Sequence, residues 1–165
     1  MTLSRYTDYV IFGALAVAGV MLLVSRSGGP DVGGQAADFE LPHVDGEGSF
    51  KLADQRGKRV VLEVFASWCG ACRRVAPELA ALHRERGDEV VFVGVSVDDS
   101  PERARAAKER WGIPYPVVLD DGSVAKGYDV SVLPTLIMID EAGEIRHAAN
   151  GVPSRAELER WLDAP

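Results

Sequence analysis

Apolar, β-branched runs alternate with helical patterns along most of the chain. Two such runs, 59–65 and 89–97, are flanked by charged or turn-forming residues and are typical of buried strands. The segment between them, from Gly70 to about Arg86, has the pattern of a helix. A strand, a helix and a second strand in this order form a βαβ unit, which implies parallel strands with the helix crossing over between them.

The remaining pattern predicts a charged helix, a short strand and a small helix, and then a hairpin and a final helix. We expect these elements at 101–111, 116–119, 123–128, 135–139 with 144–148, and 154–162, and a further short hairpin at 38–41 and 49–52. Ser154 and Glu157 form a capping-box pair at the start of the final helix. The predicted fold class is α/β, with a central mixed sheet flanked by helices on both faces.

An uncharged apolar segment, residues 9–24, precedes this domain. At ~1.5 Å per residue it spans roughly 24 Å as a helix, which lies between a secretory signal and a thin transmembrane helix. No small-x-small cleavage site follows it directly, so we expect residues 1–26 to form an uncleaved signal anchor. A buried core helix is the alternative. Four glycines and one proline in 27–34 predict a flexible tether, and the folded domain then covers 35–165.

Charge and size narrow the class of protein. The chain has 165 residues and a net charge of −7, with 18 basic and 25 acidic residues, which disfavours nucleic acid as a partner. A hydrophobic content of 47% is ample for the core of one domain. We expect this domain to be monomeric.

The chain contains only two cysteines, Cys69 and Cys72, and they lie where the first strand gives way to the helix. At this spacing two helical Cα atoms are roughly 5 to 6 Å apart, which a disulfide tolerates. A bridge across so short a loop adds little stability, so the pair is suited to opening and closing. Because the N-terminal end of a helix stabilises a thiolate, we expect Cys69 to have a depressed pKa and to attack, and Cys72 to be the more buried, resolving thiol. Half of a zinc site and two inert core cysteines are the alternatives, although the chain has no second cysteine pair.

Two segments resemble the thioredoxin superfamily. Residues 65–72 (FASWCGAC) and 76–79 (APEL) resemble the active-site strand and helix of that family. Residues 132–135 (VLPT) resemble its cis-proline loop. An entry segment at 37–42 and an extra strand-helix section at 95–128 resemble the TlpA-like, membrane-anchored thiol-disulfide oxidoreductases of bacteria. The resemblance implies a thioredoxin fold and a redox-active Cys69–Cys72 disulfide, without an external cofactor or a metal.

Glu63 is a candidate catalytic residue. It lies six positions before Cys69, where thioredoxins keep a buried acid, and an acid within an apolar strand is costly to bury. We interpret Glu63 as the proton carrier for Cys72, with a pKa raised by desolvation. The alternative is an edge-strand carboxylate that faces water.

Three further residues are candidates for substrate binding. Trp68 would shape the rim of the site, and the alternative is a plain packing role. A cis bond between Leu133 and Pro134 would leave the backbone N–H and C=O of Leu133 free to pair with an extended peptide.

Asp129 stands where relatives often carry glycine, and aspartate tolerates the left-handed backbone conformation better than most residues.

These features predict a protein-disulfide oxidoreductase held by a single pass in the bacterial plasma membrane, with its catalytic domain facing the periplasm or cell exterior. The resemblance implies the reducing direction, a membrane thiol-transfer electron donor, and extracytoplasmic client proteins such as apocytochrome c. A peroxiredoxin-like peroxide reductase is one alternative, and it would need a peroxidatic cysteine activated by a threonine and an arginine. A copper-binding thioredoxin-fold module is another, with His147 as the distal ligand.

Overall fold

The computed structural model describes residues 28–164. The predicted anchor at 9–24 lies outside this part of the chain, so it stays a prediction. Within residues 28–164, no helix combines the length and the apolar character that crossing a membrane requires.

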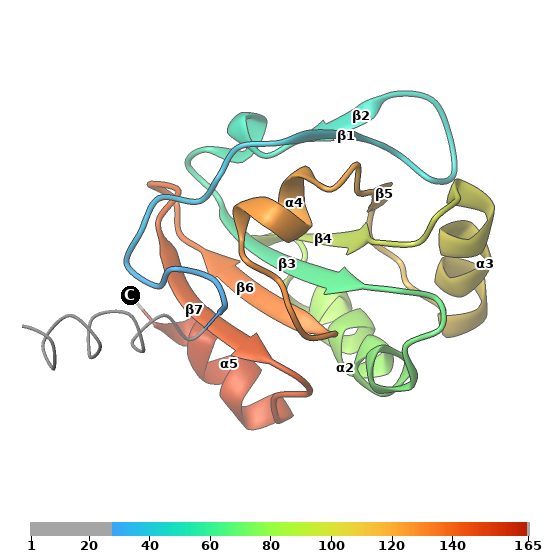
Figure 1. The fold of residues 1–165 in the computed structure, drawn as a ribbon. Coiled ribbons are helices and arrows are strands. Elements are labelled where there is room, and N and C mark those ends of the chain that lie inside the picture. Colours follow the sequence, from blue (N-terminus) through green and yellow to red (C-terminus); the bar gives the residue numbers. More distant parts are fainter. Residues whose placement is uncertain (1–27, 165) are drawn as a thin grey trace, which may run out of the picture.

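Five strands form a mixed sheet at the centre of the molecule (Figure 1). They are β3 (Arg59–Phe65), β4 (Val90–Ser96), β5 (Val117–Leu119), β6 (Thr135–Ile139) and β7 (Ile145–Asn150). The strand order is β5-β4-β3-β6-β7, in which β3 pairs parallel with β4 and antiparallel with β6. The strands β1 (Glu40–Pro42) and β2 (Ser49–Lys51) form a separate antiparallel pair.

Helices cover both faces of the sheet, as the sequence predicts (Figure 1). They are α2 (Gly70–Arg86), α3 (Pro101–Trp111), α4 (Ser123–Gly127) and α5 (Arg155–Asp163), and a single 3-10 turn, η1 (Ala53–Gln55), follows β2. One face packs against α2, α3 and α5. The other face packs against α4 and the β1–β2 pair. The predicted boundaries of these elements differ from the observed ones by two residues at most, which is the usual uncertainty of helix and strand ends.

Strand β3 has apolar contacts on both of its faces. Val61 and Phe65 point into the core beneath α2, whereas Leu62 and Val64 point into the core beneath α4. Because both faces are buried, the sequence of β3 is a nearly continuous apolar run and does not alternate between apolar and polar residues. Strand β3 is therefore held firmly in the core, and it fixes where the turn after Phe65 begins.

The residues just before the domain contact its surface. The N–H of Gly33 donates to the carbonyl of Ile145 at 2.8 Å, and the N–H of Gly29 donates to Oδ2 of Asp129 at 3.2 Å. Asp129 has the positive φ that the sequence predicts, at 50°. Residues 29–34 of the predicted tether thus share hydrogen bonds with β7 and with the loop that leads to Pro134. The boundaries of the domain remain a prediction.

Glu63 is the exception within the apolar strand β3. It lies between Gly94 of β4 and Leu136 of β6, and only 1% of its surface is exposed. The alternative of an edge-strand carboxylate facing water is therefore wrong, because β3 is the central strand of the sheet. Burial removes the water that stabilises the charged form, and this raises the pKa of Glu63 from 4.5 to about 8.

We predict that Glu63 makes the protein less stable as the pH rises. A carboxyl with a pKa of about 8 in the folded state and near 4.5 in the unfolded state binds more protons when folded between these pH values. The free energy of unfolding then decreases across this window and levels off above it. Glu63→Gln, which cannot ionise, should raise the free energy of unfolding by about 5 kcal/mol at pH 9 and by only about 1 kcal/mol at pH 5.

Urea unfolding at the two pH values measures this difference. Glu47→Gln, at an exposed position, is the matched control and should behave as the wild type does at both pH values. If Glu63→Gln were no more stable than the wild type at pH 9, a buried and destabilising carboxylate would be ruled out.

Candidate active site

Cys69 caps the N-terminus of α2. After β3 ends at Phe65, the chain turns, and the N–H of Cys69 donates to the carbonyl of Ala66 at 3.0 Å. The N–H of Cys72, in the first turn of α2, donates to Sγ of Cys69 at 3.1 Å. The sulfur of Cys69 therefore lies where the unpaired N–H groups and the positive end of the helix dipole stabilise negative charge.

A disulfide joins Cys69 and Cys72, and their Cα atoms are 5.3 Å apart, within the range that the sequence spacing predicts. Only Cys69 has contact with solvent, because 7% of its surface is exposed and none of that of Cys72. An attacking reagent can therefore reach the sulfur of Cys69, whereas that of Cys72 is enclosed by the core.

A mostly apolar groove of about 470 Å³ adjoins Cys69. Trp68 forms part of its wall and is 70% exposed, so this side chain does not serve the core as a packing residue. Leu133 lines the same groove, and the Leu133–Pro134 peptide bond is cis. The N–H and C=O of Leu133 make no hydrogen bond to other residues in the range 28–164. The structure thus brings Trp68, Cys69 and Leu133 together at one groove.

The buried carboxylate of Asp98 stabilises the turn that leads to Cys69 through hydrogen bonds. Asp98 follows β4, and its oxygens accept hydrogen bonds from the N–H of Ser67 at 2.8 Å, from Oγ of Ser67 at 2.7 Å and from Oγ of Ser96 at 2.7 Å. Ser67, Ser96 and Asp98 are not among the site residues that the sequence predicts. A feature of the sequence could have indicated them. The carboxyl ends of adjacent parallel strands meet at one edge of a sheet, so polar residues that follow β3 and β4 are expected to lie close together.

Glu63 points to the same face of the sheet as α2, the helix that carries Cys72. Its Oε2 accepts a hydrogen bond from the hydroxyl of Tyr115 at 3.1 Å, and its Oε1 has no hydrogen-bond partner in the described structure. Tyr115 is a fourth residue of the site that the sequence does not predict. No local pattern reveals it, because the contact joins positions 52 residues apart.

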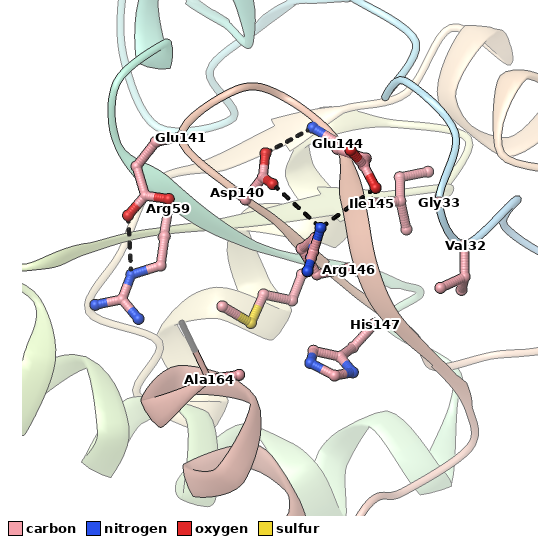
Figure 2. A pocket seen from close by; sticks show the side chains of 11 residues that line it. Val32, Gly33, Arg59, Asp140, Glu141, Glu144, Ile145, Arg146, His147 and Ala164 are labelled. Atoms are coloured by element: carbon pink, nitrogen blue, oxygen red, sulfur yellow. Dashed lines mark hydrogen bonds and ion pairs between the residues drawn. The ribbon is translucent and has the colours of Figure 1, made fainter.

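The copper alternative depends on His147, which lies far along the sheet from the dithiol. Its ring stacks on that of Trp161 with centroids 5.4 Å apart, and it lines a hollow of about 440 Å³ at the end of the sheet where β3 begins (Figure 2). The arginines of this hollow are paired: Arg59 with Glu141 at 3.4 Å, and Arg146 with Glu144 at 3.4 Å. Residues 28–164 contain no cluster of three or more His, Cys, Asp or Glu side chains that could hold a metal ion.

The peroxidase alternative needs a threonine and an arginine beside the reactive sulfur. The nearest threonine in sequence to the cis-proline, Thr135, bonds to the carbonyl of Val132 at 2.7 Å and to Asn150 at 3.0 Å. No arginine among the described residues forms a hydrogen bond with either cysteine. The geometry therefore favours exchange between dithiol and disulfide over peroxide reduction.

Comparison with known proteins agrees with this geometry. Residues 32–148 match the model of the AhpC/TSA family. The chain is 34% identical over 134 residues to the thioredoxin-like protein YneN of Bacillus subtilis, covering 79% of this chain and 78% of that protein. It is 33% identical over 137 residues to the thiol-disulfide oxidoreductase ResA of Geobacillus kaustophilus, covering 81% of this chain and 77% of that protein.

Solved structures show the same fold. A crystal structure from Chlorobium tepidum, of a protein assigned as thiol:disulfide interchange protein DsbE, superimposes with a TM-score of 0.75 at 28% identity, covering 81% of this chain and 96% of that one. StoA of Bacillus subtilis superimposes with a TM-score of 0.67 at 23% identity, covering 78% of this chain and 98% of that one. The chain therefore belongs to the AhpC/TSA family of thioredoxin-like proteins, and with its Cys69–Cys72 pair it is a thiol-disulfide oxidoreductase.

Proposed function

We propose that this protein reduces disulfides in extracytoplasmic client proteins while a single N-terminal anchor holds it to the bacterial plasma membrane. The observation that carries the reaction is the difference in access between the two sulfurs: Cys69 opens onto an apolar groove, and Cys72 is enclosed. Such an asymmetry suits one thiol for attack and the other for resolution.

The first step is attack by the Cys69 thiolate on a disulfide of the client. A bond forms between Sγ of Cys69 and one client sulfur, while the client disulfide breaks and its second sulfur leaves as a thiolate. The cap position supports this step, since the N–H of Cys72 that donates to Sγ of Cys69 at 3.1 Å also stabilises a negative charge there.

The second step is resolution by Cys72. Glu63 accepts the proton of the Cys72 thiol, and the resulting thiolate attacks Sγ of Cys69, which forms the intramolecular disulfide and releases the client thiolate. The client gains two electrons, and the dithiol loses them. The raised pKa of Glu63, about 8, suits a group that takes and returns a proton near neutral pH.

The groove binds the client polypeptide. Leu133 offers a backbone N–H and C=O without hydrogen-bond partners within residues 28–164, so an extended client segment can pair with it as an added strand. Trp68, which is largely exposed, covers the apolar part of that segment. Pro134 leaves this loop without a competing N–H at the next position.

The apolar segment at 9–24 supports a membrane setting for the reaction, and the relatives support its chemistry. ResA of Geobacillus kaustophilus is named a thiol-disulfide oxidoreductase, and the Chlorobium tepidum neighbour is assigned as a thiol:disulfide interchange protein. The resemblance to TlpA-like oxidoreductases adds a membrane thiol-transfer protein that returns electrons to the Cys69–Cys72 disulfide, and cysteines of apocytochrome c in cytochrome c maturation as a fitting client.

We predict that the Cys69–Cys72 pair of the full chain is mostly reduced in cells. A reductase must be held in the dithiol state by its donor, whereas an oxidase accumulates as the disulfide. Alkylation of thiols in intact cells, followed by isolation of the membrane fraction and mass analysis, measures the two states. Cys72→Ser supplies the reference for a chain with one thiol. A pair that is mostly oxidised while the donor is present would contradict the reducing direction.

We predict that Glu63→Gln slows resolution and changes its pH dependence. In the wild type, the rate of single-turnover insulin reduction should rise with pH around a midpoint near 8, as the Glu63 carboxyl ionises. In Glu63→Gln this rise should be absent, and the rate at pH 8 should fall by roughly 10- to 100-fold. Glu78→Gln, which changes an exposed acid on the same helix α2, should keep the wild-type profile. An unchanged profile in Glu63→Gln would remove its role as proton carrier.

A further inference from the structure

The carboxyl group of Glu63 has one polar partner within residues 28–164. The hydroxyl of Tyr115 donates to Oε2 at 3.1 Å, and Oε1 has none. Both side chains are buried, each with 1% of its surface exposed. Water is therefore scarce around this carboxyl, and the tyrosine hydroxyl is the one group that can orient it.

The ring of Tyr115 is held rigidly in place. The residue lies in the loop between α3 and β5, between Pro114 and Pro116, and each proline fixes its own backbone φ angle. The ring packs against that of Phe92 with centroids 5.8 Å apart, and it makes a T-shaped contact with that of His83 at a centroid distance of 5.7 Å. Because the ring has lost its rotamer freedom on folding, its hydroxyl is held toward Glu63.

Few other titratable groups face this pair. Cys72 and His83 lie on α2, on the same face of the sheet, and the remaining neighbouring positions of the core are apolar. The buried residues of α3 are uncharged; they are Ala104 and Ala107. The residues of β4, β5 and β6 on this face are also uncharged, and they include Phe92, Gly94, Val117, Leu136 and Met138. Three basic residues of α3 bond elsewhere: Arg103 to Asp99, Arg105 to the carbonyl of Val44, and Lys108 to Asp45. The charged side chains that share a surface hollow with Tyr115 are those of Asp45, Glu47 and Lys108, together with His43.

The hydrogen bond from Tyr115 and the burial of Glu63 shift the pKa of Glu63 in opposite directions. Desolvation raises the pKa of Glu63, and donation from Tyr115 lowers it by stabilising the carboxylate. The pKa of Tyr115 itself is raised well above its ordinary value, by burial and by the adjacent carboxylate. The hydroxyl therefore keeps its proton and remains a donor throughout the working pH range.

We propose that Tyr115 is a positioning residue for resolution: its hydroxyl occupies Oε2 of Glu63, leaves Oε1 as the atom that takes the proton of Cys72, and sets the pH at which resolution becomes fast. This proposal depends on the proposed role of Glu63 as proton carrier. In this step the proton moves from Sγ of Cys72 to Oε1 of Glu63, while the proton of Tyr115 stays on its own oxygen.

Tyr115→Phe tests the proposal, because it deletes the hydroxyl and keeps the ring that packs against Phe92 and His83. The midpoint of the rate rise in single-turnover insulin reduction should move to higher pH by about one pH unit, and the rate at pH 7 should fall by roughly tenfold. At pH 10 the two rates should agree. Tyr128→Phe is the matched control, since its hydroxyl donates to the carbonyl of Ala37 at 2.8 Å on the other face of the sheet.

A direct titration of Glu63 separates this proposal from the proposed function. The side-chain carbon of Glu63, labelled with ¹³C and assigned by its absence in Glu63→Gln, is followed with pH in the oxidised protein, where neither cysteine titrates. We expect its midpoint to rise in Tyr115→Phe and to stay constant in Tyr128→Phe.

The titration and the rate profile together separate the role of Tyr115 from that of Glu63. A midpoint that Tyr115→Phe leaves unchanged would overturn the role of Tyr115, even if Glu63→Gln abolishes the pH dependence of the rate. In a second outcome, the midpoint of the Glu63 titration rises in Tyr115→Phe, but the pH profile of the rate stays that of the wild type. This would also overturn the role of Tyr115, because the tyrosine would then shift the pKa of a carboxyl that the reaction does not use. In that second case Glu63→Gln should leave the profile unchanged as well, and the proposed function of Glu63 would fail with it.

Discussion

The burial of one carboxylate in the central strand constrains the rest of this structure. Strand β3 has neighbours on both edges and apolar cores on both faces, so Glu63 is removed from water on every side. An isolated buried charge is costly, and the group responds by holding its proton up to a pH of about 8. The proposed chemistry is thereby coupled to stability, because the raised pKa that weakens the fold at high pH also suits Glu63 to its proposed role as proton carrier.

The dithiol lies at the edge of the sheet where β3 and β4 end. The turn after β3 carries Trp68 and Cys69, and Asp98 after β4 holds this turn through Ser67. The cis-proline loop approaches from the far side and places Leu133 at the same groove. Three separate segments thus form the site, and each is attached to a strand of the rigid sheet. Such an arrangement holds the two sulfurs and Leu133 in fixed positions relative to one another.

Much of this arrangement can be predicted from local sequence. The long apolar runs give β3 and β4, and the cysteine spacing gives the start of α2, because both signals lie within a single element. Glu63 is recognisable as an acid inside an apolar run. The contacts that tune the site are not local: Ser67 and Asp98 are 31 residues apart, Glu63 and Tyr115 are 52 apart, and Gly29 and Asp129 are 100 apart. Composition likewise describes 27–34 as a tether but does not reveal that Gly33 pairs with the outer strand β7.

Trapping of the mixed disulfide tests the division of labour between the two sulfurs most directly. Cys72→Ala and Cys69→Ala, each in the reduced state, are mixed with insulin, and the covalent adducts are identified by peptide mass analysis. We predict that Cys72→Ala accumulates a long-lived adduct through Cys69, since attack proceeds and resolution is blocked. Cys69→Ala should form almost none, because Cys72 has no exposed surface. An adduct through Cys72, formed as fast as the one through Cys69, would contradict the assignment of attack and resolution.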